Sequence, residues 1–276
     1  MSNKENNIKI FKDTLQQISK SKPLQDAVEY SNGKQFYLAA GTTLPPIMLN
    51  LNRFTEPAKI IVSKESSFNA ARKYYKNVCV LNFASATNPG GGVDKGSNAQ
   101  EECLCRCSTL YLNLNTPYCK EKFYLPHREQ GTPLHNDDII YTPDVVIIKS
   151  DSYNNLYQNH KVNVITCAAP NLRETPANAY NHENGEGIKI SNDELQKLHE
   201  QRAERILNVS ALMENDYLVL GAFGCGAFRN PPEVVALAYK NVIERHFKHA
   251  FKTIEFAVFC TTDDTNYNVF KKVLTE

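Results

Sequence analysis

The 276-residue sequence has almost no net charge, no long apolar run and no secretory signal at its N-terminus. Its 31 basic and 30 acidic side chains leave a formal charge of +1, so bulk attraction to DNA or to a membrane surface is not expected. Apolar runs stay below the roughly 18 residues that a membrane span requires. The segment 1–20 contains neither the continuous apolar stretch nor the cleavage site of a secretory signal. We therefore expect an intracellular protein, cytoplasmic or in a eukaryote nuclear, with no membrane partner and no direct DNA binding.

Cysteine pairs with the spacing of a metal site are also absent, although the chain has eight cysteines. No CxxC motif occurs, and Cys79 and Cys260 fall in the apolar runs VCVLNF and FAVFC, where cysteine behaves as a small hydrophobic residue. The seven histidines are scattered along the chain rather than clustered. We therefore expect free thiols, no metal site and no cofactor.

From residue 58 onward, strand-like and helix-like segments alternate. This alternation predicts an α/β domain with a largely parallel sheet under helices. Strands are predicted at 59–63, 78–84, 145–149, 162–169, 217–223 and 254–260, and helices at 66–76 and 100–114, from Ser191 and from Pro231. Residues 1–57 are expected to form an accessory region, an amphipathic helix followed by short strands and turns, packed on a main domain at 58–276. The polar insert at 171–190 is expected to be a surface loop.

Two glycine-rich segments each follow a predicted buried strand and precede a helix. Gly90-Gly91-Gly92 comes after the strand at 78–84, and the second segment, 221–226, follows the strand at 217–220. Glycine lets the backbone approach a ligand closely and point N–H groups at its oxygen atoms, which suits a phosphate or diphosphate. Neither a P-loop nor a dinucleotide-binding fingerprint fits the surrounding residues. Two such loops could hold one diphosphate from both sides, and two unrelated tight turns are the alternative.

Seven residues after the first glycine run, Gln100-Glu101-Glu102 opens a predicted helix. Acidic residues in a first helical turn are favourable against the helix dipole, which explains them without any ligand. The alternative is that both carboxyl groups face a ligand, one contacting a sugar hydroxyl and the other acting as acid and base. A carboxyl group beside a held diphosphate, without a metal cluster, points to chemistry at a glycosidic bond.

The stretch LNFASATNPGGGVDKGSNAQEECLCRCSTLY, residues 81–111, resembles the signature of macrodomain-type poly(ADP-ribose) glycohydrolases in their bacterial-like branch. VITCAAPN, LVLGAFGCGAFRNPP and FAVFC resemble later blocks of that family in the same order, so the likeness covers about residues 58–275. The segment VDKGSNA is more polar than its counterpart in the family. The resemblance implies a macrodomain-like three-layer α/β/α fold with a mixed sheet, to which the N-terminal accessory region is added.

The same resemblance implies hydrolysis of ribose–ribose O-glycosidic bonds in poly(ADP-ribose), with ADP-ribose as the product. Glu102 would be the general acid and base, and Glu101 and Asn88 would hold the ribose next to the scissile bond. The other residues implied in ADP-ribose binding are Gly90, Gly91, Gly92, Gln100, Gly224, Cys225, Gly226 and Ala227. Phe228 would pack against the adenosine half, or be an ordinary core aromatic.

Two other functions stay open at this point. One is a hydrolase that removes single ADP-ribose units from a protein or nucleic acid, so the partner would be poly(ADP-ribose) or an ADP-ribosylated protein. The other is a macrodomain that only binds ADP-ribose, and the acidic pair favours an enzyme over it.

Overall fold

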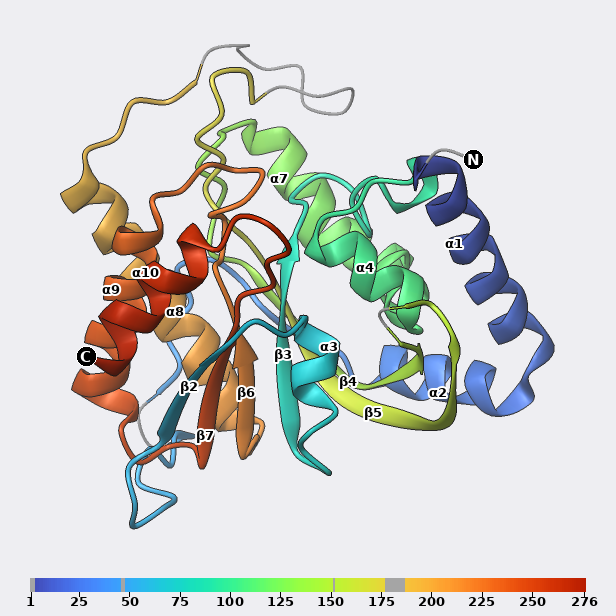
Figure 1. Ribbon diagram of the computed structural model, residues 1–276, viewed down its shortest axis with the longest axis horizontal. Coiled ribbons are helices and arrows are strands. Elements are labelled where there is room, and N and C mark those ends of the chain that lie inside the picture. Colours follow the sequence, from blue (N-terminus) through green and yellow to red (C-terminus); the bar gives the residue numbers. More distant parts are fainter. Residues whose placement is uncertain (1–2, 46–47, 151, 177–186) are drawn as a thin grey trace.

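The computed structural model describes residues 3–45, 48–150, 152–176 and 187–276 (Figure 1). Their centre is a seven-stranded sheet in the order β1-β4-β5-β3-β6-β7-β2. The strands β5, β3, β6, β7 and β2 run parallel, and β4 and β1 add an antiparallel edge. The bounds are β1 (Phe36–Leu38), β2 (Lys59–Ser63), β3 (Val78–Ala84), β4 (Ile139–Lys149), β5 (Asn155–Ala168), β6 (Tyr217–Leu220) and β7 (Thr253–Ala257).

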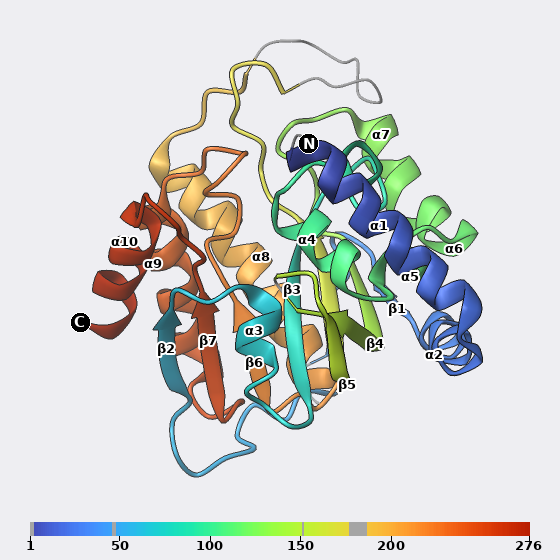
Figure 2. The ribbon, with the colours of Figure 1, turned by 45° about the vertical axis from the view of Figure 1, so that its right-hand side comes forward.

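Helices cover both faces of this sheet, as Figures 1 and 2 show. One face carries α8 (Asn192–Leu212), α9 (Pro232–Val242) and α10 (Thr265–Thr275), and the other carries α1 (Asn3–Lys20), α3 (Ser67–Ala71) and α4 (Gln100–Cys107). The remaining helices are α2 (Lys22–Gly33), η2 (Val93–Lys95), α5 (Leu110–Leu114), α6 (Pro117–Cys119), η3 (Lys120–Tyr124), α7 (Leu125–Gln130) and η4 (Ile243–Phe247). The expected three-layer α/β/α fold with a mixed sheet is confirmed.

The alternation of side chains along β3 explains why the sheet needs both helical layers. Leu81 packs in the core beneath α8 and α9. The preceding residue of the strand, Val80, packs on the opposite face, in the core formed with α4. Successive residues of a strand point to opposite faces, so a nearly continuous apolar strand must be buried on both. The run VCVLNFA therefore becomes the central strand of the molecule.

The sheet is less parallel than the strand pattern predicts. The strands expected at 145 and 162 begin earlier, at Ile139 and Asn155, and pair antiparallel as one long hairpin. A register shift between Thr142 and Val145 lets β4 continue past Pro143, because a bulge accommodates the missing N–H of proline.

The helix predicted at 100–114 is two helices. Ser108 between them is extended, pairs with Ile147 of β4, and donates its hydroxyl to the carbonyl of Leu104. The helix predicted at 66–76 is also shorter and ends at Ala71. The predicted starts of α8 and α9 are confirmed, since Ser191 forms a capping box with Glu194 and α9 begins at Pro232.

The N-terminal segment is integrated with the rest of the fold. The predicted amphipathic helix is α1, which lies along α4 (Figure 2) and buries Phe11 and Ile18. β1 joins the sheet beside β4. Half of the insert at 171–190 lies outside the described residues, which include 171–176 and 187–190. Across the described residues, no helix combines the length and apolar character needed to cross a membrane.

Candidate active site

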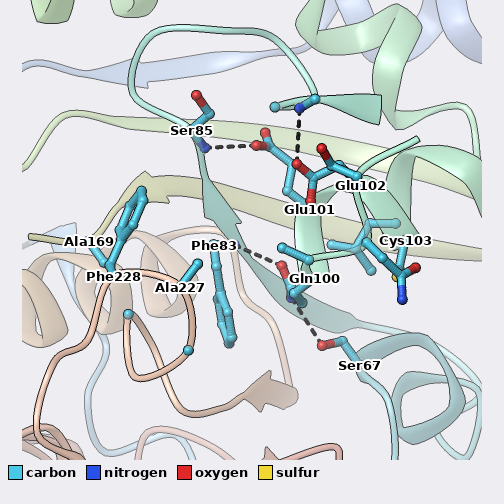
Figure 3. Close-up of a pocket in the computed structure, with 18 of the residues that line it drawn as sticks. Ser67, Phe83, Ser85, Gln100, Glu101, Glu102, Cys103, Ala169, Ala227 and Phe228 are labelled. Atoms are coloured by element: carbon cyan, nitrogen blue, oxygen red, sulfur yellow. Dashed lines mark hydrogen bonds between the residues drawn. The ribbon is translucent and has the colours of Figure 1, made fainter. Parts of the chain in front are cut away.

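A cleft of about 1050 Å³ opens at the carboxyl ends of the parallel strands. This is the edge at which open α/β sheets bind ligands. Its lining comes from the two glycine loops, the start of α4, and segments after β5 and β7. Figure 3 shows Glu101 and Glu102 side by side at the start of α4, with Ala227 and Phe228 across the end of β3.

The first glycine loop places two of its three glycines against the cleft. Gly91 and Gly92 line it, whereas a Cβ on Gly90 would lie only 2.9 Å from the Tyr111 ring. Gly90 and Gly91 have φ values of +69° and +59°, which favour glycine. Gly90 therefore supports the loop from beneath, and Gly91 and Gly92 present backbone to the cleft.

Gln100 attaches the start of α4 to the end of β3. Its Oε1 accepts from the Phe83 N–H at 2.9 Å, and its Nε2 donates to the Leu81 carbonyl at 2.7 Å. β6 pairs with β3 only as far as Val80, so the Gln100 amide continues the hydrogen bonding where the two strands separate. Gln100 also lines the cleft, and its three polar contacts, the third to Ser67, all go to protein groups.

Glu101 is the more deeply buried of the two carboxyl groups, with 3% of its surface exposed. It accepts hydrogen bonds from the Ser85 N–H at 2.7 Å and from the Asn82 amide at 3.2 Å. Burial, with a contribution from the charge of Glu102, raises the pKa of Glu101 to about 8, although hydrogen bonds from Ser85, Asn82 and Gly90 lower it. Burial therefore favours the protonated form of Glu101.

The two carboxyl oxygens of Glu102 differ in their hydrogen bonding. Its Oε1 accepts from the Gly92 N–H at 2.9 Å, and among the described residues its buried Oε2 has no hydrogen-bond partner. A buried acceptor without a partner is costly in a native protein, and a substrate can supply the missing partner. The residue is 7% exposed and lines the cleft.

Asn88 lines the cleft beside the glycines, and its side chain is oriented by Arg128 of α7. The Arg128 guanidinium donates to the Thr87 carbonyl at 2.7 Å and to Asn88 Oδ1 at 3.3 Å. Because Oδ1 is engaged in this way, the Nδ2 group of Asn88 is the end left to donate to a ligand.

The second glycine loop contributes Gly224, Gly226, Ala227 and Phe228 to the lining. Gly224 has a φ of +79°, and a Cβ there would collide with Asn230 and Ala169, so this glycine is needed for packing. A Cβ on Gly226 would meet nothing within 4 Å. The Cys225 thiol is not part of the lining, and burial raises its pKa.

Comparisons with known proteins identify the family to which this chain belongs. The family model for the microbial-type PARG catalytic domain matches residues 6–150, where PARG is poly(ADP-ribose) glycohydrolase. This chain is a microbial-type PARG. Its structure is similar to that of a Deinococcus radiodurans PARG in complex with ADP-ribose, at 31% identity and a TM-score of 0.76, over 90% of this chain and 96% of that one.

A PARG from Thermomonospora curvata is also similar, at 26% identity and a TM-score of 0.81, over 98% of this chain and 99% of that one. The same enzyme bound to the inhibitor ADP-HPD gives 27% identity and a TM-score of 0.79, over 97% of this chain and 99% of that one. No curated protein matches the chain.

The cleft of this PARG has a wall that sequence reasoning missed. His135 and Arg173 line it and face Phe228, with 6.2 Å between the His135 and Phe228 ring centres and 5.7 Å from the Arg173 guanidinium to the Phe228 ring. His135 has a φ of +56°, and burial lowers its pKa to about 3, so its ring is neutral. His135 lies in the loop between α7 and β4, and Arg173 follows β5, both outside any recognisable motif.

Proposed function

We propose that this chain hydrolyses the ribose–ribose O-glycosidic bonds of poly(ADP-ribose) and releases ADP-ribose, with Glu102 as the general acid and base. The observation that carries the proposal is the unpartnered Oε2 of Glu102, next to two glycines that present backbone to the same cleft. Membership of the microbial-type PARG family supports the reaction, and the ADP-ribose bound to the Deinococcus relative supports the ligand.

In the proposed complex, the two glycine loops hold the diphosphate from opposite sides. Gly91 and Gly92 lie on one side and Gly226 on the other, where the absence of a Cβ leaves room for the ligand. Asn88 donates its Nδ2 group to a hydroxyl of the terminal ribose. Backbone N–H groups and local dipoles bind the anion, so the chain's near-neutral charge is no obstacle.

Cleavage then follows the chemistry of a glycosidic bond with an oxocarbenium-like transition state. Protonated Glu102 donates the proton on Oε2 to the bridging oxygen of the leaving ribose as the bond to the anomeric carbon breaks. The resulting carboxylate takes a proton from a water molecule that attacks the same carbon, which restores the acid. The hydrogen bond from Gly92 to Oε1 fixes which oxygen faces the substrate.

Glu101 has a different role in this scheme. Both of its oxygens accept hydrogen bonds from protein groups, so it is not free to exchange a proton directly with the substrate. A neutral Glu101 next to Glu102 avoids two negative charges in one buried site. We propose that it holds the end of β3 and the first turn of α4 together while contacting the ribose.

The test is a comparison of two substrates under the same conditions. Poly(ADP-ribose) and a protein carrying single ADP-ribose units are incubated with the chain, and released ADP-ribose is measured by chromatography. The proposal predicts rapid release from the polymer and slow or no release from the singly modified protein. Faster release from the singly modified protein would instead favour a mono-ADP-ribosyl hydrolase, and release from neither would contradict an enzyme.

A further inference from the structure

The N-terminal helix lies against the loop that controls Glu102. We propose that Asn7 of α1 is a positioning residue, which acts through the segment 92–97 to hold the Gly92 N–H against the Glu102 carboxylate. This inference rests on the proposed function, because it concerns how the general acid is kept in place. Figure 2 shows α1 running past the start of α4.

The first contact joins α1 to the tip of the loop. Asn7 is only 6% exposed, and its Nδ2 donates to the Gly96 carbonyl at 3.0 Å. Gly96 has a φ of +77°, and a Cβ at this position would lie 2.4 Å from the Lys4 carbonyl oxygen. The two backbones therefore approach so closely that only glycine fits, and α1 acts as a surface against which the loop is seated.

A short series of hydrogen bonds leads from this tip to the carboxylate. The Gly96 N–H donates to the Val93 carbonyl, and the N–H groups of Lys95 and Ser97 both donate to the Gly92 carbonyl. The Gly92 N–H then donates to Glu102 Oε1 at 2.9 Å. The segment 92–97 is thus one compact turn, so movement at Gly96 is transmitted to Gly92.

A second contact with α1 holds the segment 92–97 through Arg106 of α4. Thr14, two turns further along α1, donates its hydroxyl to the Arg106 carbonyl at 2.5 Å. The fully buried Arg106 side chain donates back to the Ser97 carbonyl and to Asn98 Oδ1, each at 2.5 Å. Lys149 supports Thr14 with a hydrogen bond of 2.7 Å. The loop and α4 are therefore fixed to α1 at two points.

Apolar packing would keep α1 attached without Asn7. Phe11 contacts Tyr111 edge to face at 4.9 Å, and Ile18 is buried in a separate cluster with Val146 and Ile148. Apolar packing therefore attaches α1 to the fold, and the Asn7 hydrogen bond sets the position of the segment 92–97. The polar contact of Asn7 goes to the first glycine loop, whose Gly92 N–H bonds Glu102. Loss of the Asn7 contact should consequently affect Glu102 more than it affects binding of the diphosphate.

Asn7→Asp removes the Nδ2 donor with little change in shape. We expect kcat on poly(ADP-ribose) to fall on the order of tenfold or more, because small misplacements of a catalytic group are costly, and the Kd of ADP-ribose to rise by less than about threefold. Gly96→Ala disrupts the same contact from the loop side. We expect the same fall in kcat with little change in the Kd of ADP-ribose. Asn7→Ala, which removes the same donor without adding a charge, serves if Asn7→Asp folds poorly.

Ile18→Ala is the matched control, since it weakens the packing of α1 far from the loop. It should lower the melting temperature while leaving kcat and the Kd of ADP-ribose unchanged. Hydrogen exchange of the Gly92 and Ser97 amides reports the contact without any turnover, and it should speed up about tenfold in Asn7→Asp but not in Ile18→Ala.

Wild-type kcat and wild-type amide exchange in Asn7→Asp, or equal losses in Ile18→Ala, would overturn the positioning role. An inactive wild-type protein would instead refute the proposed function, and the exchange measurement would still decide about Asn7.

Discussion

Replacement of Glu101 by glutamine tests the electrostatics of the site through the stability of the unliganded protein. The pKa of Glu101 is about 8 in the folded protein and 4.5 as its ordinary value. Between these two pH values the folded chain keeps a proton that the unfolded chain releases, so the wild-type protein loses stability as the pH rises. Glutamine keeps the shape of the protonated acid but does not titrate, so Glu101→Gln should not suffer this loss.

The size of the effect follows from about 1.4 kcal/mol for each pH unit by which the two pKa values differ. Between pH 5 and pH 8, the free energy of unfolding of the wild-type protein should fall by roughly 3 to 4 kcal/mol relative to Glu101→Gln. Urea unfolding of both proteins across this range gives the difference directly, and titrating groups that are not coupled to Glu101 cancel in it. Parallel stability profiles for the two proteins would show that Glu101 ionises normally and would refute the reasoning.

Two further variants test the binding surfaces. Gly226→Val places a side chain in the open cleft. We expect its thermal stability to be unchanged and its ADP-ribose binding, measured by calorimetry, to be weakened by about tenfold. Wild-type affinity would exclude the second loop from the ligand site. Arg128→Lys cannot bond both the Thr87 carbonyl and Asn88 Oδ1, so the Asn88 amide should lose its orientation and the Kd of ADP-ribose should rise about threefold to tenfold. A Kd equal to that of the wild-type protein would show that Arg128 does not orient Asn88.

The central part of the fold was predictable because its signals are local. The apolar run at β3, the capping residue Ser191 and the proline at the start of α9 each specify an element through neighbouring residues. The long β4–β5 hairpin was not predictable to the same extent. Its bulge accommodates Pro143 within a strand, and the pairing partner that stabilises this lies elsewhere in the sequence.

The site likewise has a part that local sequence signals predicted and a part that they did not. The first glycine run and the acidic pair stand close together in the sequence, and the fold places them at one cleft with the second glycine loop. Which glycine faces the cleft depends on residues distant in the sequence. Tyr111 packs under Gly90, whereas among the described residues nothing lies within 4 Å of a Cβ on Gly226. His135 comes from a loop without a motif, so no local signal could have identified it.

The boundary predicted at residue 57 stays a prediction, and the structure offers a physical argument against a simple division there. β1 contributes a strand to the common sheet, and Asn7 and Thr14 bond to the loop and helix that carry the acidic pair. We propose that residues 1–57 fold together with the remainder as one unit.

The most direct test of the central claim is turnover and ligand binding of Glu102→Gln. Glutamine keeps the hydrogen bond from Gly92 but cannot donate and retake the proton. We predict that release of ADP-ribose from poly(ADP-ribose) falls about 10²- to 10⁴-fold, while calorimetry still detects ADP-ribose binding with an affinity close to that of the wild-type protein. Hydrolysis of the polymer by Glu102→Gln at the wild-type rate would contradict the account.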